Sequence, residues 1–382
     1  MTEKITPNDV LRTISEGCES CGVCAAACEL LADLDSTPGE IAASLIRDEL
    51  GDGLLAAIQR CDLCGACAQD CPAGLQPASL FLAARQRLME SGALSPDDYD
   101  VMLVDRDWHS FTLYRATYGI DNADLLADSY ESLFFPGCTL ANYAPELTRA
   151  AFTWLQGQGL QLGFTDLCCG KPLASIGLSE RAGRLLDRLC AQVKAAEAHE
   201  IITTCPNCEA QLRAAQLSGI RIRSLYDLME QAGIRLNGNQ TLTFHDSCPD
   251  RNNEANPRSV RALLSGFPRV EMASRGKDTI CCGSGGIVSM IDPDLCTRRA
   301  DRRLAEFTAS GADLCVTSCM ACSYRLARAS QPGQVRHCLE LVFDRLVDYA
   351  EVERMTHAMW EGAQGEINRE RLAQALVVPL KA

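Results

Sequence analysis

The sequence predicts an α/β protein in which a mostly helical N-terminal domain precedes two similar α/β domains with parallel sheets. After residue 131, short apolar strand-like runs alternate with helical patterns, which favours largely parallel sheets. In the same region five cysteines recur at offsets of 110, 113 and 114 residues, which indicates a duplication. Residues 29–60 and 78–91 have helical patterns instead. The expected domains are residues 1–91, a connector at 92–131, two α/β domains at 132–236 and 237–350, and a helical tail at 351–382.

The amino-acid composition excludes several classes of function and binding partner. Of the 382 residues, 47% are hydrophobic, which is enough to bury a sizeable core, and the net charge is −14. This acidity argues against nucleic-acid binding and against docking on anionic lipid. There is no long apolar run and the N-terminus does not resemble a signal peptide, so we expect no direct membrane insertion and a cytoplasmic location. Thiols stay reduced there, so the 22 cysteines point to metal or catalysis rather than disulfides.

Two cysteine runs of identical spacing, CESCGVCAAAC and CDLCGACAQDC, lie 43 residues apart. The C-x2-C-x2-C-x3-C spacing is that of two-cluster ferredoxins, in which the fourth cysteine of each run ligates the other cluster. The sequence therefore predicts a ferredoxin-type domain with two [4Fe–4S] cubane clusters. The ligands of the first are expected to be Cys18, Cys21, Cys24 and Cys71, and those of the second Cys28, Cys61, Cys64 and Cys67.

Details of these runs fit tight loops around a cluster. Gly22 and Gly65 follow the second cysteine of each run, where a positive φ angle is expected. Cys28 and Cys71 are each expected to begin a helix. Glu29 follows Cys28 where ferredoxins commonly have proline, a difference that affects no ligand. Structural zinc is the alternative, but zinc sites use separated cysteine pairs, which fit these packed runs poorly.

The connector contains an aromatic group at Trp108, His109, Tyr114 and Tyr118. Such a group could form a wall between cluster sites or contact a partner. We favour simple aromatic packing between domains. His109 alone does not indicate a metal ligand.

The duplicated region carries a second cysteine constellation. In each copy, one cysteine follows a strand-like run, a Cys-Cys-Gly sequence comes next, and a C-x2-C pair follows another strand. The first copy has Cys138, Cys168, Cys169, Cys205 and Cys208, and the second has Cys248, Cys281, Cys282, Cys319 and Cys322. Because binding sites of α/β sheets lie at the carboxyl ends of the strands, each set should gather at one rim, and the two sets should face each other across a pseudo-twofold axis. Five thiols exceed the four that a cubane needs, so a larger or irregular cluster is expected.

This pattern resembles the doubled CCG domain of heterodisulfide reductase B and D subunits, which also occurs in the iron–sulfur subunits of glycerol-3-phosphate, glycolate and lactate dehydrogenases. The order of domains is similar to that of the D-type subunit over residues 18 to about 345. The resemblance implies two non-cubane [4Fe–4S] clusters, between which a disulfide substrate is cleaved. All ten cysteines are present here, whereas many dehydrogenase-type relatives have lost some. Two positions depart from the family: Pro249 replaces a frequent histidine and Met320 a usual proline.

The catalytic residues are otherwise unknown, and two weak candidates remain. Lys171 follows the first Cys-Cys-Gly and could place positive charge near an anionic substrate or cluster, or it could be a solvated loop residue. His245 could substitute for the missing histidine, although a structural role at a strand end is the commoner case. Gly283, Gly285 and Gly286 are expected to permit close backbone approach around a cluster. Four further cysteines, which fall outside the repeats, are expected to be buried and free: Cys190, Cys296, Cys315 and Cys338.

Two functions fit these features. In the first, a heterodisulfide-reductase-like subunit passes electrons through the cubanes to the CCG clusters, where a disulfide or thiol substrate is reduced or oxidised. In the second, the chain is the electron conduit of a flavin-dependent dehydrogenase. Both imply redox partners, namely a flavoprotein, a membrane or quinone-linked subunit, or both. A disulfide reductase needs an open substrate cleft between the CCG sites, and a conduit does not. A zinc-stabilised scaffold is a third, remote interpretation.

Overall fold

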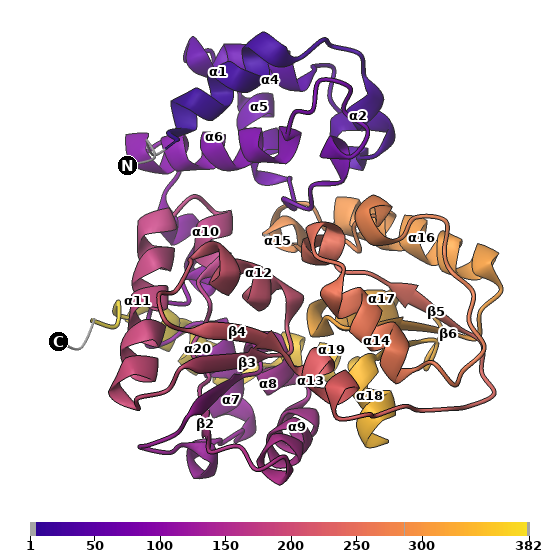
Figure 1. The fold of residues 1–382 in the computed structure, drawn as a ribbon. Helices are drawn as coiled ribbons and strands as arrows, with labels where there is room; N and C mark the ends of the chain where they lie inside the picture. The colour runs from indigo at the N-terminus through magenta and orange to yellow at the C-terminus, as the bar shows by residue number, and fades with distance from the viewer. Residues whose placement is uncertain (1–4, 286, 380–382) are drawn as a thin grey trace.

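The computed structural model describes residues 5–285 and 287–379, and its N-terminal domain is helical as predicted (Figure 1). Threonines begin two of its main helices: the Thr6 and Thr37 side chains accept hydrogen bonds from backbone N–H groups of the first turn and form capping boxes with Asp9 and Glu40. The first strand of the described chain begins only at Ser132. The N-terminal elements are α1 (Pro7–Gly17), α2 (Val23–Ala26), α3 (Glu29–Ala32), α4 (Pro38–Ile46), α5 (Asp52–Gln59), η1 (Ala66–Ala68) and α6 (Pro77–Ser91).

The first α/β domain has a four-stranded parallel sheet of order β2-β1-β3-β4, which Figure 1 shows below the N-terminal domain. Its central strands are buried at every position, as expected of strands that helices cover on both faces. The connector before it forms η2 (Pro96–Met102), α7 (Ser110–Tyr118) and η3 (Ala123–Leu125). The domain itself comprises β1 (Ser132–Phe135), α8 (Cys138–Tyr143), α9 (Pro145–Gly157), β2 (Leu162–Phe164), α10 (Lys171–Ser175), α11 (Ser179–Ala195), β3 (Glu200–Thr203), α12 (Pro206–Ala214), β4 (Arg221–Ser224) and α13 (Leu225–Gln231).

The second α/β domain repeats this arrangement with a three-stranded parallel sheet of order β5-β6-β7. An isolated parallel bridge between Leu242 and Arg269 occupies the place that β2 takes in the first sheet. The duplication is therefore confirmed, but one edge strand of the second copy is reduced to a single bridge. The elements are β5 (Leu242–His245), η4 (Cys248–Asn252), α14 (Ala255–Leu263), η5 (Gly276–Asp278), α15 (Val288–Ile291), α16 (Pro293–Ser310), β6 (Leu314–Thr317), α17 (Met320–Ala329), β7 (Val335–His337) and α18 (Cys338–Phe343).

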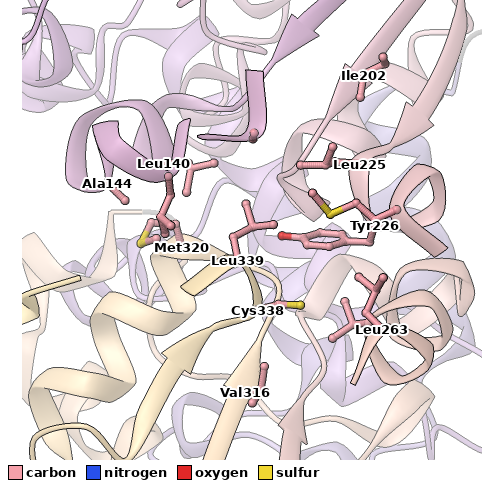
Figure 2. Packing of buried hydrophobic residues seen from close by; sticks show 14 of the residues in the cluster. Leu140, Ala144, Ile202, Leu225, Tyr226, Leu263, Val316, Met320, Cys338 and Leu339 are labelled. Carbon is pink, nitrogen blue, oxygen red and sulfur yellow. The ribbon is translucent and has the colours of Figure 1, made fainter. Parts of the chain in front are cut away.

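The two α/β domains share one hydrophobic core, which Figure 2 shows from close by. Its side chains come from both copies, among them Leu140, Leu225 and Tyr226 of the first and Val316 and Leu339 of the second. The Tyr226 hydroxyl, which is buried, donates a hydrogen bond of 2.9 Å to the backbone carbonyl of Ser318. Because a common core resists relative motion, the cysteine sites of the two domains are held in a fixed geometry.

The C-terminal helices α19 (Tyr349–Ala358) and α20 (Gly362–Ala373) pack on α7 of the connector. The ring of Tyr114 on α7 lies 5.6 Å from that of Tyr143, which in turn lies 5.1 Å from the ring of Tyr324 on α17. This row of rings joins the connector to both α/β domains, in agreement with the favoured interpretation of the connector aromatics. No helix in the described part of the chain is long and apolar enough to cross a membrane.

Arg85 on α6 links the N-terminal domain to the first α/β domain through buried hydrogen bonds. Its side chain is 1% exposed and donates to three carbonyls of the N-terminal domain, those of Ile58, Gln59 and Cys61, at 2.6–3.1 Å. A fourth bond of 2.7 Å reaches the carbonyl of Ser175 at the end of α10. All of these acceptors are backbone oxygens, which compensate the burial of the guanidinium.

We predict that Arg85→Met destabilises the protein by about 3 kcal/mol, because it leaves several buried carbonyls without donors. The midpoint of urea unfolding under anaerobic conditions would measure the loss. Arg87→Met on the same helix is the control, since Arg87 is partly exposed and makes one backbone contact and one surface ion pair. Equal midpoints for the two variants would contradict the role of Arg85.

Candidate metal centres

The first ferredoxin-type set lines a single cavity. Cys18, Cys21 and Cys24 of the first run surround it together with Cys71 of the second run. Gly22 has the expected positive φ angle of 76°, which lets the loop turn between Cys21 and Cys24. The structure thus brings together the four cysteines that the sequence analysis assigned to one cluster, and thiolates are the donors that a cubane requires.

The second set gathers in the same crossed manner. Cys28, the last cysteine of the first run, lies beside Cys61, Cys64 and Cys67 of the second. Burial raises the pKa of the Cys67 thiol, and its three cysteine neighbours raise it further. Gly65 has a φ angle of 75°, matching Gly22 in the other run. Four thiolates this close together would repel one another without a positive centre, so a metal cluster is what would let these cysteines act as ligands.

The expectation that both fourth cysteines begin a helix is correct for only one of them. Cys28 is the N-cap of α3. Cys71 leads instead into a turn, and α6 begins six residues later at Pro77. Gly74, with a φ angle of 65°, produces this turn, and Pro72 and Pro77 on either side disfavour helix between them.

In the first α/β domain the five cysteines meet at the carboxyl ends of the strands. Cys138 is the first residue of α8, three residues after the end of β1, and Cys205 precedes α12 after β3. Hydrogen bonds connect the thiols of Cys138, Cys168, Cys169 and Cys208 in series. Gly137 makes this convergence possible, because a Cβ atom there would lie 2.9 Å from the Cβ atom of Cys205.

The second domain gathers its five cysteines at the corresponding rim. Cys248 contacts Cys281, and the sulfurs of Cys282 and Cys322 are 3.3 Å apart. Cys322 also lies beside Cys319. A hydrogen bond from Cys322, and to a lesser degree the neighbouring His245, lower the pKa of Cys282 to about 5 against the opposing effect of burial. Thiolate formation, which metal binding requires, is therefore favoured at this position.

The two cysteine-rich sites touch each other. Cys205 of the first domain hydrogen-bonds to Cys319 of the second. These two cysteines occupy equivalent positions in the repeats, 114 residues apart. Their contact marks the pseudo-twofold axis that the duplication predicted, and it joins the ten cysteines into one continuous group.

The ferredoxin-type domain docks directly on the second site, which nothing in the sequence indicated. Cys64 lies against Cys248 and Cys281, and hydrogen bonding with these two cysteines holds the pKa of Cys64 well below the usual range of a thiol. Next to them, Asp62 accepts a bond of 3.1 Å from the Cys281 thiol and pairs with Arg299 of α16 at 2.6 Å. Burial raises the pKa of Asp62 to about 7 although Arg299 opposes this shift.

Further ion pairs between α16 and the ferredoxin-type domain surround this contact. Glu29, the residue that replaces the common proline, lies 3.1 Å from Arg302 and 3.6 Å from Arg299. Asp33 accepts a bond of 3.0 Å from Arg298. The arginine-rich sequence of α16, CTRRADRRLAEF, was the available signal, but nothing local reveals which acids it meets.

The two weak candidates lie close to the sites. Lys171 begins α10 and is half-buried; burial lowers its pKa, whereas the neighbouring Cys169 and Cys248 raise it. The Lys171 side chain is therefore partly enclosed and within electrostatic reach of one cysteine of each cysteine-rich site. His245, the last residue of β5, is 2% exposed, and one of its ring nitrogens lies within 4.8 Å of the sulfurs of Cys282 and Cys322.

The glycines after the second Cys-Cys pair serve contacts between protein segments. Gly283, with a φ angle of 78°, packs against the carbonyl of Cys296 on α16. A Cβ atom on Gly285 would lie 2.9 Å from the carbonyl oxygen of Asp62 in the ferredoxin-type domain. The close approach is thus to neighbouring backbone, whereas we had expected approach to a cluster; Gly286 lies outside the described residues.

Three of the four cysteines outside the motifs, namely Cys296, Cys315 and Cys338, are buried as expected of small apolar side chains. Cys190 is only half-buried, so the expectation of burial is wrong for it. It lies on α11, whose outer face is exposed to solvent.

An open cavity of about 560 Å³ lies where the two cysteine-rich domains meet. Its lining comes from α12 of the first domain and η4 of the second, elements that begin next to Cys205 and at Cys248. Asn256 bridges two of its carboxylates, donating to Glu209 at 2.6 Å and to Asp250 at 3.4 Å. The lining residues are Pro206, Glu209, Ala210, Arg213, Pro249, Asp250, Asn252 and Asn253.

Comparison with known proteins agrees with these sites. Residues 14–75 match the 4Fe-4S dicluster domain family, and residues 132–213 and 242–327 match the cysteine-rich CCG domain family. The dicluster domain supplies two [4Fe–4S] clusters, and the cysteine-rich domains suit additional iron–sulfur clusters.

Similar proteins of known type are redox-enzyme subunits. The chain is 24% identical to the B-type subunit of the fumarate reductase (CoM/CoB) of Methanothermobacter marburgensis, over 85% of this chain and 70% of that protein. It is 25% identical to the D-type subunit of the dihydromethanophenazine:CoB–CoM heterodisulfide reductase of Methanosarcina barkeri, over 71% and 72% of the two chains. A probable glycolate oxidase iron-sulfur subunit of Bacillus subtilis is 24% identical over 55% and 54%.

We predict that Cys282→Ser removes iron from the second cysteine-rich site and leaves both ferredoxin-type clusters intact, because Cys282 contacts Cys322, whereas the cysteines of this site that contact Cys64 are Cys248 and Cys281. Iron analysis and EPR spectroscopy of the reduced protein would measure this. Cys315→Ser is the matched control, since Cys315 is an equally buried thiol of the same domain outside the cysteine group. Loss of the ferredoxin-type EPR signals in Cys282→Ser alone would contradict this division of the sites.

Proposed function

We propose that this iron–sulfur oxidoreductase subunit, which joins a 4Fe-4S dicluster domain to two cysteine-rich CCG domains, reduces or oxidises a disulfide or thiol substrate at its paired cysteine-rich sites. The ligands are the 18 cysteines named above, with two cubanes in the ferredoxin-type domain and one non-cubane [4Fe–4S] cluster in each CCG domain. When bound, these clusters supply single-electron storage and iron that can take up sulfur.

The cavity between α12 and η4 carries this proposal. It opens at the junction of the two CCG domains, and Pro206 and Pro249 in its wall directly follow Cys205 and Cys248. A disulfide must reach both cysteine-rich sites, so an opening at their junction is the feature that a reductase needs. A volume of about 560 Å³ is within the range of small-molecule sites, and its polar lining suits a substrate with hydrogen-bonding groups.

The contacts of Cys64 support an internal supply of electrons. This cysteine belongs to the second ferredoxin-type set and bonds to Cys248 and Cys281 of the second CCG site. The donor set of one centre therefore touches that of the next, and the contact of Cys205 with Cys319 continues the series into the first CCG site. Such contiguity is what sequential single-electron transfer requires.

The reaction balances with two electrons and two protons. Reduction breaks the substrate's S–S bond and forms two thiols, and the electrons come from a redox partner subunit. Negative charge develops on the sulfurs as the bond breaks, and Lys171, within electrostatic reach of Cys169 and Cys248, provides the nearby positive charge. The reverse reaction returns the electrons to the partner.

Because exposed thiols and clusters persist under reducing conditions, we place the protein in the cytoplasm.

A second candidate function is favoured by the similarity to the Bacillus subtilis protein named a probable glycolate oxidase iron-sulfur subunit. In this function the chain conducts electrons between a flavoprotein and a membrane or quinone-linked subunit, and it binds no substrate of its own. The cavity distinguishes the two functions, because a conduit does not depend on access to it.

We predict that anaerobically purified protein contains about sixteen irons, since four [4Fe–4S] clusters are expected. After oxidation, a small thiol should produce a new EPR signal. 2-Mercaptoethanol and 3-mercaptopropionate are suitable probes, and Lys171 should favour the anionic one.

Ala210→Trp, which fills the cavity, should abolish the thiol-dependent signal at unchanged iron content. Ala214→Trp is the control, because Ala214 is exposed on the same helix outside the cavity.

Either of two results would favour the conduit. One is a wild-type protein with sixteen irons and no response to thiols. The other is an Ala210→Trp variant whose thiol-dependent signal equals that of Ala214→Trp. About eight irons would restrict clusters to the ferredoxin-type domain and would also contradict the reductase proposal.

A further inference from the structure

The two CCG repeats differ at two pairs of equivalent positions next to their sites. The last residue of β1 is Phe135 and that of β5 is His245, at the same 110-residue offset as the cysteines that follow them. On the covering helices, Leu189 of α11 corresponds to Arg303 of α16 at an offset of 114 residues. All four side chains are at most 2% exposed. A buried Phe–Leu pair in one copy is therefore a buried His–Arg pair in the other.

Arg303 fixes the tautomer of His245. Its Nε atom donates a hydrogen bond of 2.9 Å to Nδ1 of the imidazole. Because a guanidinium remains protonated, Nδ1 must offer its lone pair, and the proton of the neutral ring lies on Nε2. Arg303 is itself held in place by the carbonyls of Ser274 at 2.7 Å and Phe244 at 3.2 Å and by the carboxylate of Glu306.

The Nε2–H group of His245 faces the second CCG site. Nε2 is buried and has no hydrogen-bond partner among the residues that the structure describes. A ring nitrogen, the Cys282 sulfur and the Cys322 sulfur all lie within 4.8 Å of one another, and since Nδ1 is bound to Arg303, the nitrogen directed at the sulfurs is Nε2. An unpaired buried donor is costly, and the sulfurs within 4.8 Å are acceptors that a small movement of the ring would bring into hydrogen-bond distance.

The tautomer also decides between ligand and donor. A histidine that binds a metal through Nε2 normally donates its Nδ1–H to a carboxylate or carbonyl. Here Nδ1 accepts a bond from a cation, so Nε2 retains its proton and has no lone pair for a metal. In this tautomer His245 can serve as an N–H donor to sulfur but not as a ligand through Nε2.

We propose that His245 donates a hydrogen bond to the Cys282 sulfur, with Arg303 as its positioning residue, and thereby gives the second CCG cluster a higher reduction potential than the first. Hydrogen bonds to ligand sulfur stabilise the reduced, more negative state of a cluster. Phe135 and Leu189 provide no such donor in the first site. This inference rests on the part of the proposed function that places a cluster in each CCG domain, but not on the identity of the substrate.

As a consequence, the two CCG sites have different roles in electron transfer. The second site is the one next to Cys64, so electrons from the ferredoxin-type domain reach it first. A higher potential there retains the first electron close to the entry point until the second arrives. The apolar first site then differs from it in potential, although the cysteine ligands are the same in number and order.

The test is an EPR-monitored redox titration of the complete protein without any thiol. His245→Phe reproduces the first repeat and should lower the potential of the second site, leaving that of the first site unchanged. His245→Gln keeps an N–H donor near the Nε2 position and should retain most of the wild-type potential. Iron content should be unchanged in both variants. Arg303→Leu, which releases Nδ1, should lower the second-site potential as His245→Phe does.

Pulsed EPR gives a second readout that a purely structural role would not affect. An exchangeable proton coupled to the second site should disappear in His245→Phe and persist in His245→Gln. Loss of iron from the second site in both variants would show that His245 is a ligand and would overturn the proposal. Equal potentials in wild type and His245→Phe would overturn it too. Absence of a thiol-dependent signal would leave these results unaffected, so the two proposals fail separately.

Discussion

The arrangement of the domains depends on one requirement, which is that cysteines from distant segments of the chain come into contact. Cys71 joins cysteines about fifty residues before it, and Cys205 meets Cys319 across the boundary between two domains. The carboxyl ends of parallel strands provide the natural place for such a meeting, because every strand of a sheet ends at the same rim. The shared core around Tyr226 then fixes the two rims against each other (Figure 2). Gly137 lacks a Cβ atom, and such an atom there would clash with Cys205 and keep the sulfurs apart.

The docking of the ferredoxin-type domain uses charge where the rest of the core uses apolar packing. Arg299 of α16 pairs with the buried Asp62, whereas the corresponding residue of α11 is the buried Leu185. A buried ion pair contributes little net stability, because desolvation offsets its attraction, but it strongly disfavours arrangements in which either charge lacks its partner. The pair therefore selects one orientation of the domain. That orientation places Cys64 against Cys281, the contact from which we infer the electron route.

Much of this could be predicted from the sequence, and the parts that could not have a common reason. Spacing alone grouped the cysteines into the sets that the structure brings together, because each set follows from short local rules applied twice. The strands before Cys138 and Cys248 were predictable from their apolar runs. The contact of Cys64 with the second site was not, since it depends on how two domains far apart in the sequence dock. Nor was the turn after Cys71, where Gly74 and two prolines override the analogy with Cys28.

The four cysteine sites differ in how deeply they are buried, and contacts between cysteines join three of them in one series. In the first ferredoxin-type set Cys21 is exposed, whereas Cys61 and Cys67 of the second are buried, and the second set adjoins the second CCG site. A centre near the surface suits exchange with a partner protein, because electron transfer falls off with distance. A centre enclosed by protein suits passage to the next one. The cavity between Pro206 and Pro249 lies at the junction of the two CCG domains and shares no lining residue with the cavity around Cys18, Cys21, Cys24 and Cys71. The most exposed cysteine set and the opening between the CCG domains are therefore separate places on the molecule.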